Sequence, residues 1–117
     1  KETLGSEWRQ YEEIFPALNT SKVEQVSLEC QGSKVPISLI RLLDQKTVLV
    51  GAIDVATREV ETPDAVARIL AEAAKHADLE RIQACTNCGM APLPRQIAAD
   101  KLRALGAGAV LARKLLH

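Results

Sequence analysis

Aromatic residues are scarce in this sequence, at 3% of 117 residues, and neither sign of charge is in excess. Fifteen basic residues balance fifteen acidic ones, so no long-range field attracts a polyanion, and we do not expect nucleic acid as a partner. The longest apolar runs, such as 107–112, are far shorter than the roughly 20 residues that cross a bilayer. These features argue against both a nucleic acid-binding protein and a membrane protein.

Several sequence signals are also missing. The N-terminus has neither an initiator Met nor a charged-then-apolar export signal, so it predicts a cut inside a longer chain. Three cysteines without export features indicate a reducing compartment, and we expect a cytoplasmic protein. No glycine-rich phosphate loop follows a predicted strand, and neither histidine lies where it could activate a Ser or Cys nucleophile. Nucleotide binding and triad hydrolysis are therefore not predicted.

The apolar residues follow a pattern that indicates alternating helices and strands. Thr62 and Pro63 predict a helix start, because threonine caps a first turn and proline fits the first helical position. We expect Gly106 and Gly108 to weaken the last helix. The predicted order αβαβαβα comprises helices over 8–18, 36–43, 63–76 and 95–116, and strands over 23–29, 46–54 and 79–85. Strands joined by helices lie parallel with right-handed connections, so the fold class is α/β, either a doubly wound sheet or part of a βα barrel.

Candidate functional residues stand where the predicted strands end. The first strand ends in Glu29 and Cys30, the second in Asp54, and the third is followed by Cys85 and Cys88. In either architecture the carboxyl ends of parallel strands meet at one rim, where chemistry collects. Carboxylate and thiolate are both zinc donors, so a metal site is one interpretation. The alternative is a solvated strand end with core thiols and a loop cysteine.

The spacing Cys85-x-x-Cys88 also suits half of a structural zinc site or a redox pair. A structural zinc site needs further ligands, and the remaining candidates are Cys30, His76 and His117. We expect His76 to be a solvent-facing residue at a helix end rather than a ligand.

Asp54 has two interpretations. Its carboxylate could orient substrate or a metal-bound group at the rim, or it could cap the turn that follows the strand. Arg58, Glu59 and Glu61 are interpreted as charges at the entry to the next helix.

Three stretches, VSLECQGSKVP, VLVGAIDVATREVETPDAV and CTNCGMAPLPRQIAADKLRAL, together resemble the C-terminal end of the cobalamin-independent methionine synthase family. The resemblance covers about residues 23–113. It implies that residues 1–117 are the C-terminal three βα units of one catalytic TIM (βα)8 barrel domain. Such a piece is incomplete on its own, so we expect it to pack against the missing N-terminal part of the barrel.

The same resemblance implies that Glu29 and Cys88 are zinc ligands. The family's upstream His-x-Cys pair has no counterpart in this sequence. The implied activity is zinc-dependent methyl transfer to a thiol, most simply from a methyl-folate to homocysteine, giving methionine. Zinc suits this reaction because coordination converts an alkyl thiol into a thiolate at neutral pH.

Two departures from the family pattern keep other activities open. Ala56 replaces the family's histidine, a proposed proton donor to the folate leaving group, and Asn87 replaces an aspartate before the ligand Cys88. One alternative is a divergent zinc thiol alkyltransferase that acts on coenzyme M or uses another methyl donor. Another is a non-catalytic metal or redox module that uses Cys85 and Cys88.

Overall fold

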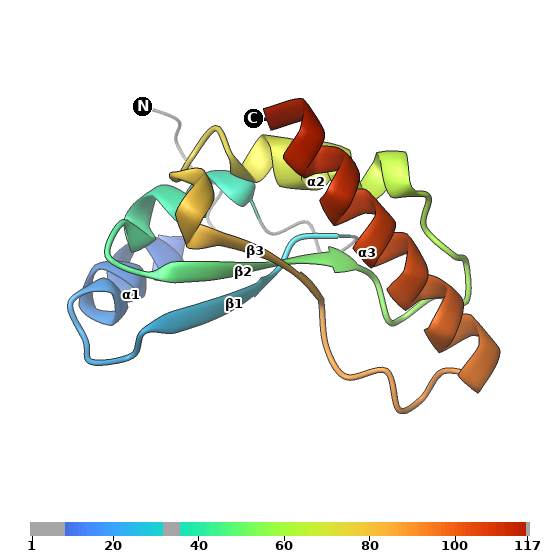
Figure 1. The fold of residues 1–117 in the computed structure, drawn as a ribbon. Coiled ribbons are helices and arrows are strands. Elements are labelled where there is room, and N and C mark those ends of the chain that lie inside the picture. Colours follow the sequence, from blue (N-terminus) through green and yellow to red (C-terminus); the bar gives the residue numbers. More distant parts are fainter. Residues whose placement is uncertain (1–8, 32–35, 117) are drawn as a thin grey trace.

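The computed structural model describes residues 9–31 and 36–116 and has an α/β fold (Figure 1). Within these ranges the elements follow the predicted alternation of helices and strands. The strands are β1 (Gln25–Glu29), β2 (Thr47–Ile53) and β3 (Ile82–Thr86). The α-helices are α1 (Arg9–Asn19), α2 (Pro63–Ala73) and α3 (Arg95–Leu116), and the 3₁₀ helices are η2 (Ile37–Leu43) and η3 (Leu79–Arg81).

The strands form a parallel sheet in the order β1-β2-β3, with β2 in the centre. Glu29 pairs with Gly51, and Gly51 pairs with Cys85, so these residues form one row across the carboxyl end of the sheet. Pairing between β2 and β3 becomes irregular between Gly51 and Ile53, as at a β-bulge. The parallel arrangement confirms the prediction made from the helical connections.

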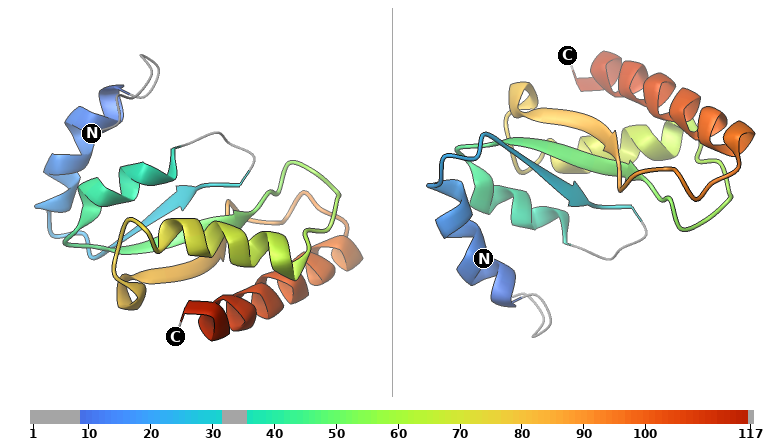
Figure 2. Two further views of the ribbon diagram at one scale, coloured as in Figure 1. Left: turned by 90° about the horizontal axis from the view of Figure 1, so that it is seen from above. Right: turned by 90° about the horizontal axis from the view of Figure 1, so that it is seen from below.

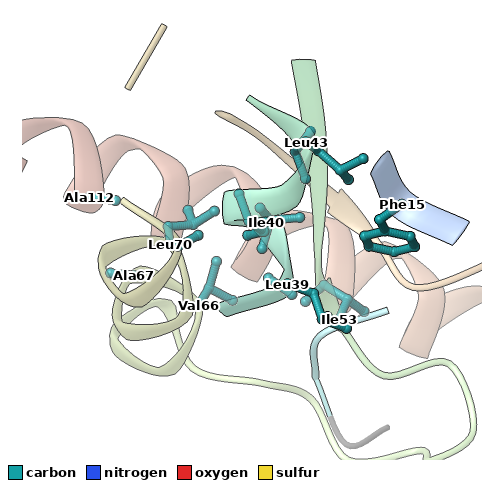
Figure 3. Packing of buried hydrophobic residues seen from close by; sticks show 13 residues of the cluster. Phe15, Leu39, Ile40, Leu43, Ile53, Val66, Ala67, Leu70 and Ala112 are labelled. Atoms are coloured by element: carbon teal, nitrogen blue, oxygen red, sulfur yellow. The ribbon is translucent and has the colours of Figure 1, made fainter. Parts of the chain in front are cut away.

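Helices α2 and α3 cover one face of the sheet, and the view from below shows the strands in front of both helices (Figures 1 and 2). Side chains from β2, α1, η2, α2 and α3 meet in one hydrophobic core, part of which is drawn in Figure 3. Ile40, Leu43, Ile53 and Val66 are completely buried there. Burying each side chain of this size stabilises the fold by about 1.5–3 kcal/mol. The core therefore lies between the sheet and its helices, on the face away from the strands' polar side chains.

The opposite face of the sheet, called the open face below, carries mostly polar or small side chains. Because side chains alternate along a strand, the neighbours of the core residues point to this face. The open face consists of Gln25, Ser27, Glu29, Thr47, Leu49, Gly51, Gln83 and Cys85. The polarity of the open face contrasts with the core face, whose side chains are apolar.

Most local predictions are confirmed within a residue or two, but two boundaries were wrong. The strand predicted to begin at Leu79 begins at Ile82, because the preceding turn is a 3₁₀ helix whose Arg81 side chain donates to Leu43 O and Lys46 O at 3.0 and 3.1 Å. The helix predicted to reach His76 ends at Ala73. There, hydrogen bonds between residues three apart tighten the chain into turns.

The predicted start of α2 is confirmed. Thr62 Oγ1 accepts a hydrogen bond from Ala65 N at 3.1 Å, and Pro63 occupies the first helical position. No helix among residues 9–31 and 36–116 is long and apolar enough to cross a bilayer.

Helix α3 continues unbroken through both glycines, which differ in what surrounds them. Gly108 is buried against α2, where a Cβ would meet the Val66 side chain and lie 3.0 Å from Pro63 O. A Cβ on Gly106 would meet nothing within 4 Å. Gly108 therefore permits the close approach of α2 and α3, whereas Gly106 has no such role.

We expect Gly108→Ala to lower the free energy of unfolding by about 1–3 kcal/mol, because the added methyl group overpacks the contact with Val66. The matched control, Gly106→Ala, should raise it by up to about 1 kcal/mol through helix propensity. Urea unfolding midpoints measure both changes. Equal effects of the two substitutions would contradict the packing role of Gly108.

Candidate functional site

The predicted site residues lie on the segments that leave the carboxyl ends of the strands, residues 29–31, 54–61 and 86–89, called the rim below. Glu29 is the last residue of β1, Asp54 follows β2 directly, and Cys88 lies shortly after β3. Glu29 and Cys88 are exposed, and Asp54 is half-buried. The sheet thus places all of them at one end of the molecule.

Main-chain hydrogen bonds fix the outer rim segments to the central strand. Cys30 N and Gln31 N both donate to Gly51 O, at 3.1 and 2.9 Å. Asn87 N donates to Ile53 O at 2.9 Å. The segments that carry Glu29 and Cys88 are therefore both anchored on β2.

The Asn87 side chain joins these segments to each other. Its Nδ2 donates to Gln31 O at 2.6 Å, and Gln31 follows Glu29 by two residues while Asn87 precedes Cys88. Its Oδ1 is buried and has no hydrogen-bond partner among the described residues. A carboxylate has no hydrogen to donate to the Gln31 carbonyl. The amide at this position therefore has a structural reason, which the sequence alone did not reveal.

Gly51 makes room for that link. A Cβ at this position would meet Asn87 Oδ1 and would lie 2.7 Å from Leu28 O and 3.0 Å from Asn87 Cα. Gly51, which lies between Glu29 and Cys85 in the row across the sheet, has no side chain, and the Asn87 amide occupies the space that a side chain would fill.

Asp54 is held by a buried ion pair that the sequence did not lead us to expect. The Lys101 side chain is 0% exposed, and its Nζ lies 2.9 Å from Glu61 Oε1, a group only 7% exposed. Lys101 Nζ also donates to Asp54 O at 2.9 Å and to Glu59 O at 2.6 Å. Asp54 N donates to Glu61 Oε2 at 2.8 Å.

The interpretation of Glu61 as a helix-entry charge was wrong, because its carboxylate is the partner of a buried ammonium group. Lys101 was missed by reasoning from the sequence, although the helical period contained a signal. Lys101 lies on the buried stripe of α3, whose other members are the small residues Ala104, Gly108 and Ala112. A lysine on the buried stripe of a helix requires an acceptor in the core.

The Asp54 side chain does cap the following turn, as one of its predicted interpretations requires. Its Oδ1 accepts a hydrogen bond from Ala56 N at 2.9 Å. The capping interpretation of Asp54 is therefore confirmed, and the contact uses one of the two carboxylate oxygens.

The cysteines are all free thiols, and they differ in their surroundings. Burial raises the pKa of Cys30 to about 11, with a smaller contribution from Cys85. Burial also raises the pKa of Cys85, whose Sγ lies 3.8 Å from Ser27 Oγ on the open face. Cys88 is exposed. The two half-buried thiols are therefore poor nucleophiles at neutral pH.

Within residues 9–31 and 36–116, no group of three or more His, Cys, Asp or Glu side chains could hold a metal ion. His76 accepts a hydrogen bond at Nδ1 from Arg41 Nε at 2.7 Å and is half-buried rather than solvent-facing. His117, the other histidine, lies outside the described residues. Glu29 and Cys88 can thus supply donors of the right chemistry for zinc, but only part of a ligand set.

A cavity of about 330 Å³ lies away from the rim, between β3, α2 and α3. Its lining consists mainly of apolar side chains, including Leu70, Leu79, Ile82, Ala109, Ala112 and Leu116. It contains none of the predicted site residues.

Known proteins resemble this chain in sequence and in structure. Residues 8–110 match the family described as "Cobalamin-independent synthase, Catalytic domain". Methionine synthases from Sulfolobus acidocaldarius and Sulfurisphaera tokodaii are 31% and 32% identical over 108 residues, covering 92% of this chain and 32% of each relative. A B12-independent methionine synthase from a Shewanella species, solved in complex with selenomethionine, is 54% identical with a TM-score of 0.89. That match covers 97% of this chain and 33% of the other, so this chain spans about a third of the length of these relatives.

We expect Gly51→Ala to lower the free energy of unfolding by about 1–3 kcal/mol, because its Cβ overlaps the Asn87 amide and the Leu28 carbonyl. The NMR signals of the Asn87 side-chain amide should shift as the link to Gln31 is displaced. Gly89→Ala is the control, since a Cβ there meets nothing within 4 Å. Unchanged Asn87 signals in Gly51→Ala would contradict the geometry of the link.

In metal-free protein at pH 8, we expect iodoacetamide to modify Cys88 at least about tenfold faster than Cys30, because Cys88 is exposed while burial of Cys30 raises its pKa and lowers its thiolate fraction. Mass spectrometry of timed samples measures the rates, and equal rates for both thiols would contradict the lower reactivity of Cys30.

Burial of Cys30 also makes stability depend on pH. Because its folded pKa lies above the ordinary value of 9.0, the thiol ionises at a lower pH in the unfolded chain than in the folded protein. The contribution of Cys30 to stability is therefore complete well below pH 9 and is lost as the pH rises toward 11.

Proposed function

Because this chain belongs to the cobalamin-independent synthase catalytic-domain family, we propose that it is part of a zinc-dependent methyltransferase that converts homocysteine to methionine. Family membership confirms the resemblance found in the sequence. The relatives reported above are methionine synthases, which supports this reaction in particular. The observation that carries the metal assignment is the rim itself, where Glu29 and Cys88 stand on segments joined by the Asn87 amide.

Residues 1–117 would form the C-terminal three βα units of a (βα)8 barrel and would belong to one catalytic domain. Two features support this arrangement: the parallel sheet and the helices on one of its faces. In a barrel of this kind the open face borders the interior, and the site lies at the carboxyl ends of the strands. The ligands that complete the zinc site, a His-x-Cys pair, would come from barrel strands outside these residues.

Glu29 would hold the metal through a carboxylate oxygen, and Cys88 through its thiolate. Both donors are exposed on the same rim, and Cys88 can reach the metal without leaving a packed core. Zinc, when bound, lowers the pKa of a coordinated alkyl thiol, so that the sulfur of homocysteine becomes nucleophilic at neutral pH. Asp54 would orient the reactants from the segment after β2.

The methyl donor is a methyl-folate in this proposal, and a single residue favours an alternative. Ala56 has no group that could transfer a proton to a folate leaving group, unlike the histidine that is usual in the family. A divergent zinc thiol alkyltransferase with a different methyl donor is therefore the second candidate. Both candidates use the same metal ligands and differ in the donor that supports turnover.

We expect about one zinc per chain in the longest natural protein that contains this sequence. Glu29→Ala and Cys88→Ala should each lower the zinc affinity by at least about tenfold, because each removes a ligand. Cys85→Ala is the matched control and should keep the metal, since Cys85 lies half-buried within β3. Elemental analysis after dialysis against a weak chelator measures the difference.

An equal loss of zinc in Cys85→Ala would instead support the metal or redox module. Absence of zinc from the unsubstituted protein would contradict the methyltransferase proposal. Where zinc is present, methionine formation from homocysteine with a methyl-folate, compared with other methyl donors, separates the two candidates.

A further inference from the structure

The peptide groups on both sides of Asp54 are held by the same ion pair. Asp54 N donates to Glu61 Oε2 at 2.8 Å, and Asp54 O accepts from Lys101 Nζ at 2.9 Å. The pair closes on itself through the 2.9 Å contact between Lys101 Nζ and Glu61 Oε1. Lys101 and Glu61, called the clamp below, thus fix the main chain at the point where β2 leaves the sheet.

A carboxylate is required at position 61 because both of its oxygens accept, one from Lys101 and the other from Asp54. A glutamine has a single acceptor oxygen and would turn an N–H group toward one of these donors. The ammonium group is equally occupied, with acceptors on Asp54, Glu59 and Glu61. Each group of the clamp therefore has a specific partner.

Stability alone does not account for this arrangement. Replacing a buried ion pair by apolar residues of similar volume is often neutral or stabilising, since two charges must be removed from water. The clamp fixes the main-chain conformation at Asp54, and thereby the direction in which its side chain leaves the main chain. Asp54 is half-buried and lies on the rim. The contact between Asp54 Oδ1 and Ala56 N limits the side chain further.

We propose that Lys101 and Glu61 are positioning residues that hold Asp54 in the conformation that methyl transfer requires. This inference rests on the proposed function and on the role given there to Asp54. Neither residue of the clamp touches a reactant, because the Lys101 and Glu61 side chains are both buried, at 0% and 7% exposure. Their effect on the reaction passes through Asp54.

Lys46 offers a matched control. Its side chain is also buried, and its Nζ donates to the main-chain oxygen of Ser21 at 2.7 Å. It precedes β2, whereas Asp54 follows it, so Lys46 lies at the amino end of the same strand. Lys46→Met therefore removes a buried ammonium group from the end of the sheet that lacks the rim.

The experiment compares Lys101→Met, Lys46→Met and Asp54→Asn in the longest natural protein that contains this sequence. We expect kcat/KM to fall on the order of 10²-fold in Lys101→Met and in Asp54→Asn, the scale of a misplaced reacting geometry. The double variant Lys101→Met with Asp54→Asn should be no worse than Asp54→Asn alone, because the clamp acts through Asp54. Lys46→Met should stay within about twofold of the unsubstituted protein, and zinc content should be unchanged throughout.

Amide hydrogen exchange at Asp54 supplies a readout that is independent of turnover. Its protection should fall in Lys101→Met and stay unchanged in Lys46→Met. Where Lys101→Met does not fold, Glu61→Gln replaces it, since that substitution preserves volume and removes one of the two acceptors.

The outcomes separate this inference from the proposed function. Additive losses in the double variant, an equal loss in Lys46→Met, or unchanged protection at Asp54 would each overturn the clamp while leaving the methyltransferase standing. A protein that binds no zinc and transfers no methyl group would contradict the proposed function, and the role of the clamp with it.

Discussion

A buried ammonium group connects the last helix to the carboxyl end of the central strand. Lys101 is fully enclosed and donates to Asp54, Glu59 and Glu61, which together define the path of the segment after β2. Removing one partner of such a pair costs about 3–5 kcal/mol, because the other charge is left buried and uncompensated. The shape of this segment therefore depends on α3, a helix that begins well after it in the chain.

The rest of the rim is organised around β2 in the same way. Main-chain groups of Gly51 and Ile53 accept hydrogen bonds from the segments that follow β1 and β3. The missing side chain at Gly51 leaves space for the Asn87 amide, which joins those segments directly. Substituting a carboxylate for that amide would remove the donor, so the departure from the family pattern is linked to the packing around it. The Asn87 amide can therefore occupy its position only because residue 51 is a glycine.

In the proposed enzyme, this chain supplies part of the metal site. Glu29 and Cys88 provide two donor types that suit zinc, and the described residues contain no group of three or more His, Cys, Asp or Glu side chains that could hold a metal ion. Membership of a catalytic-domain family agrees with the proposal that further strands complete this rim. The proposed division of labour is that this part fixes two ligands and a carboxylate, and the remaining barrel contributes the other ligands.

The sequence by itself determined the alternation of elements, the parallel sheet, the cap at Thr62 and the grouping of the predicted site residues at one end. Hydrophobic period and capping are local properties, and topology then places every strand end on the same rim. Only the tertiary structure decided that Lys101 meets Glu61 across 40 residues and that Asn87 meets Gln31 across 56. The period of a helix shows which side is buried, but it does not show which acceptor a buried charge will find. That choice depends on packing between segments far apart in the chain, where the cost of an unpaired charge selects the partner.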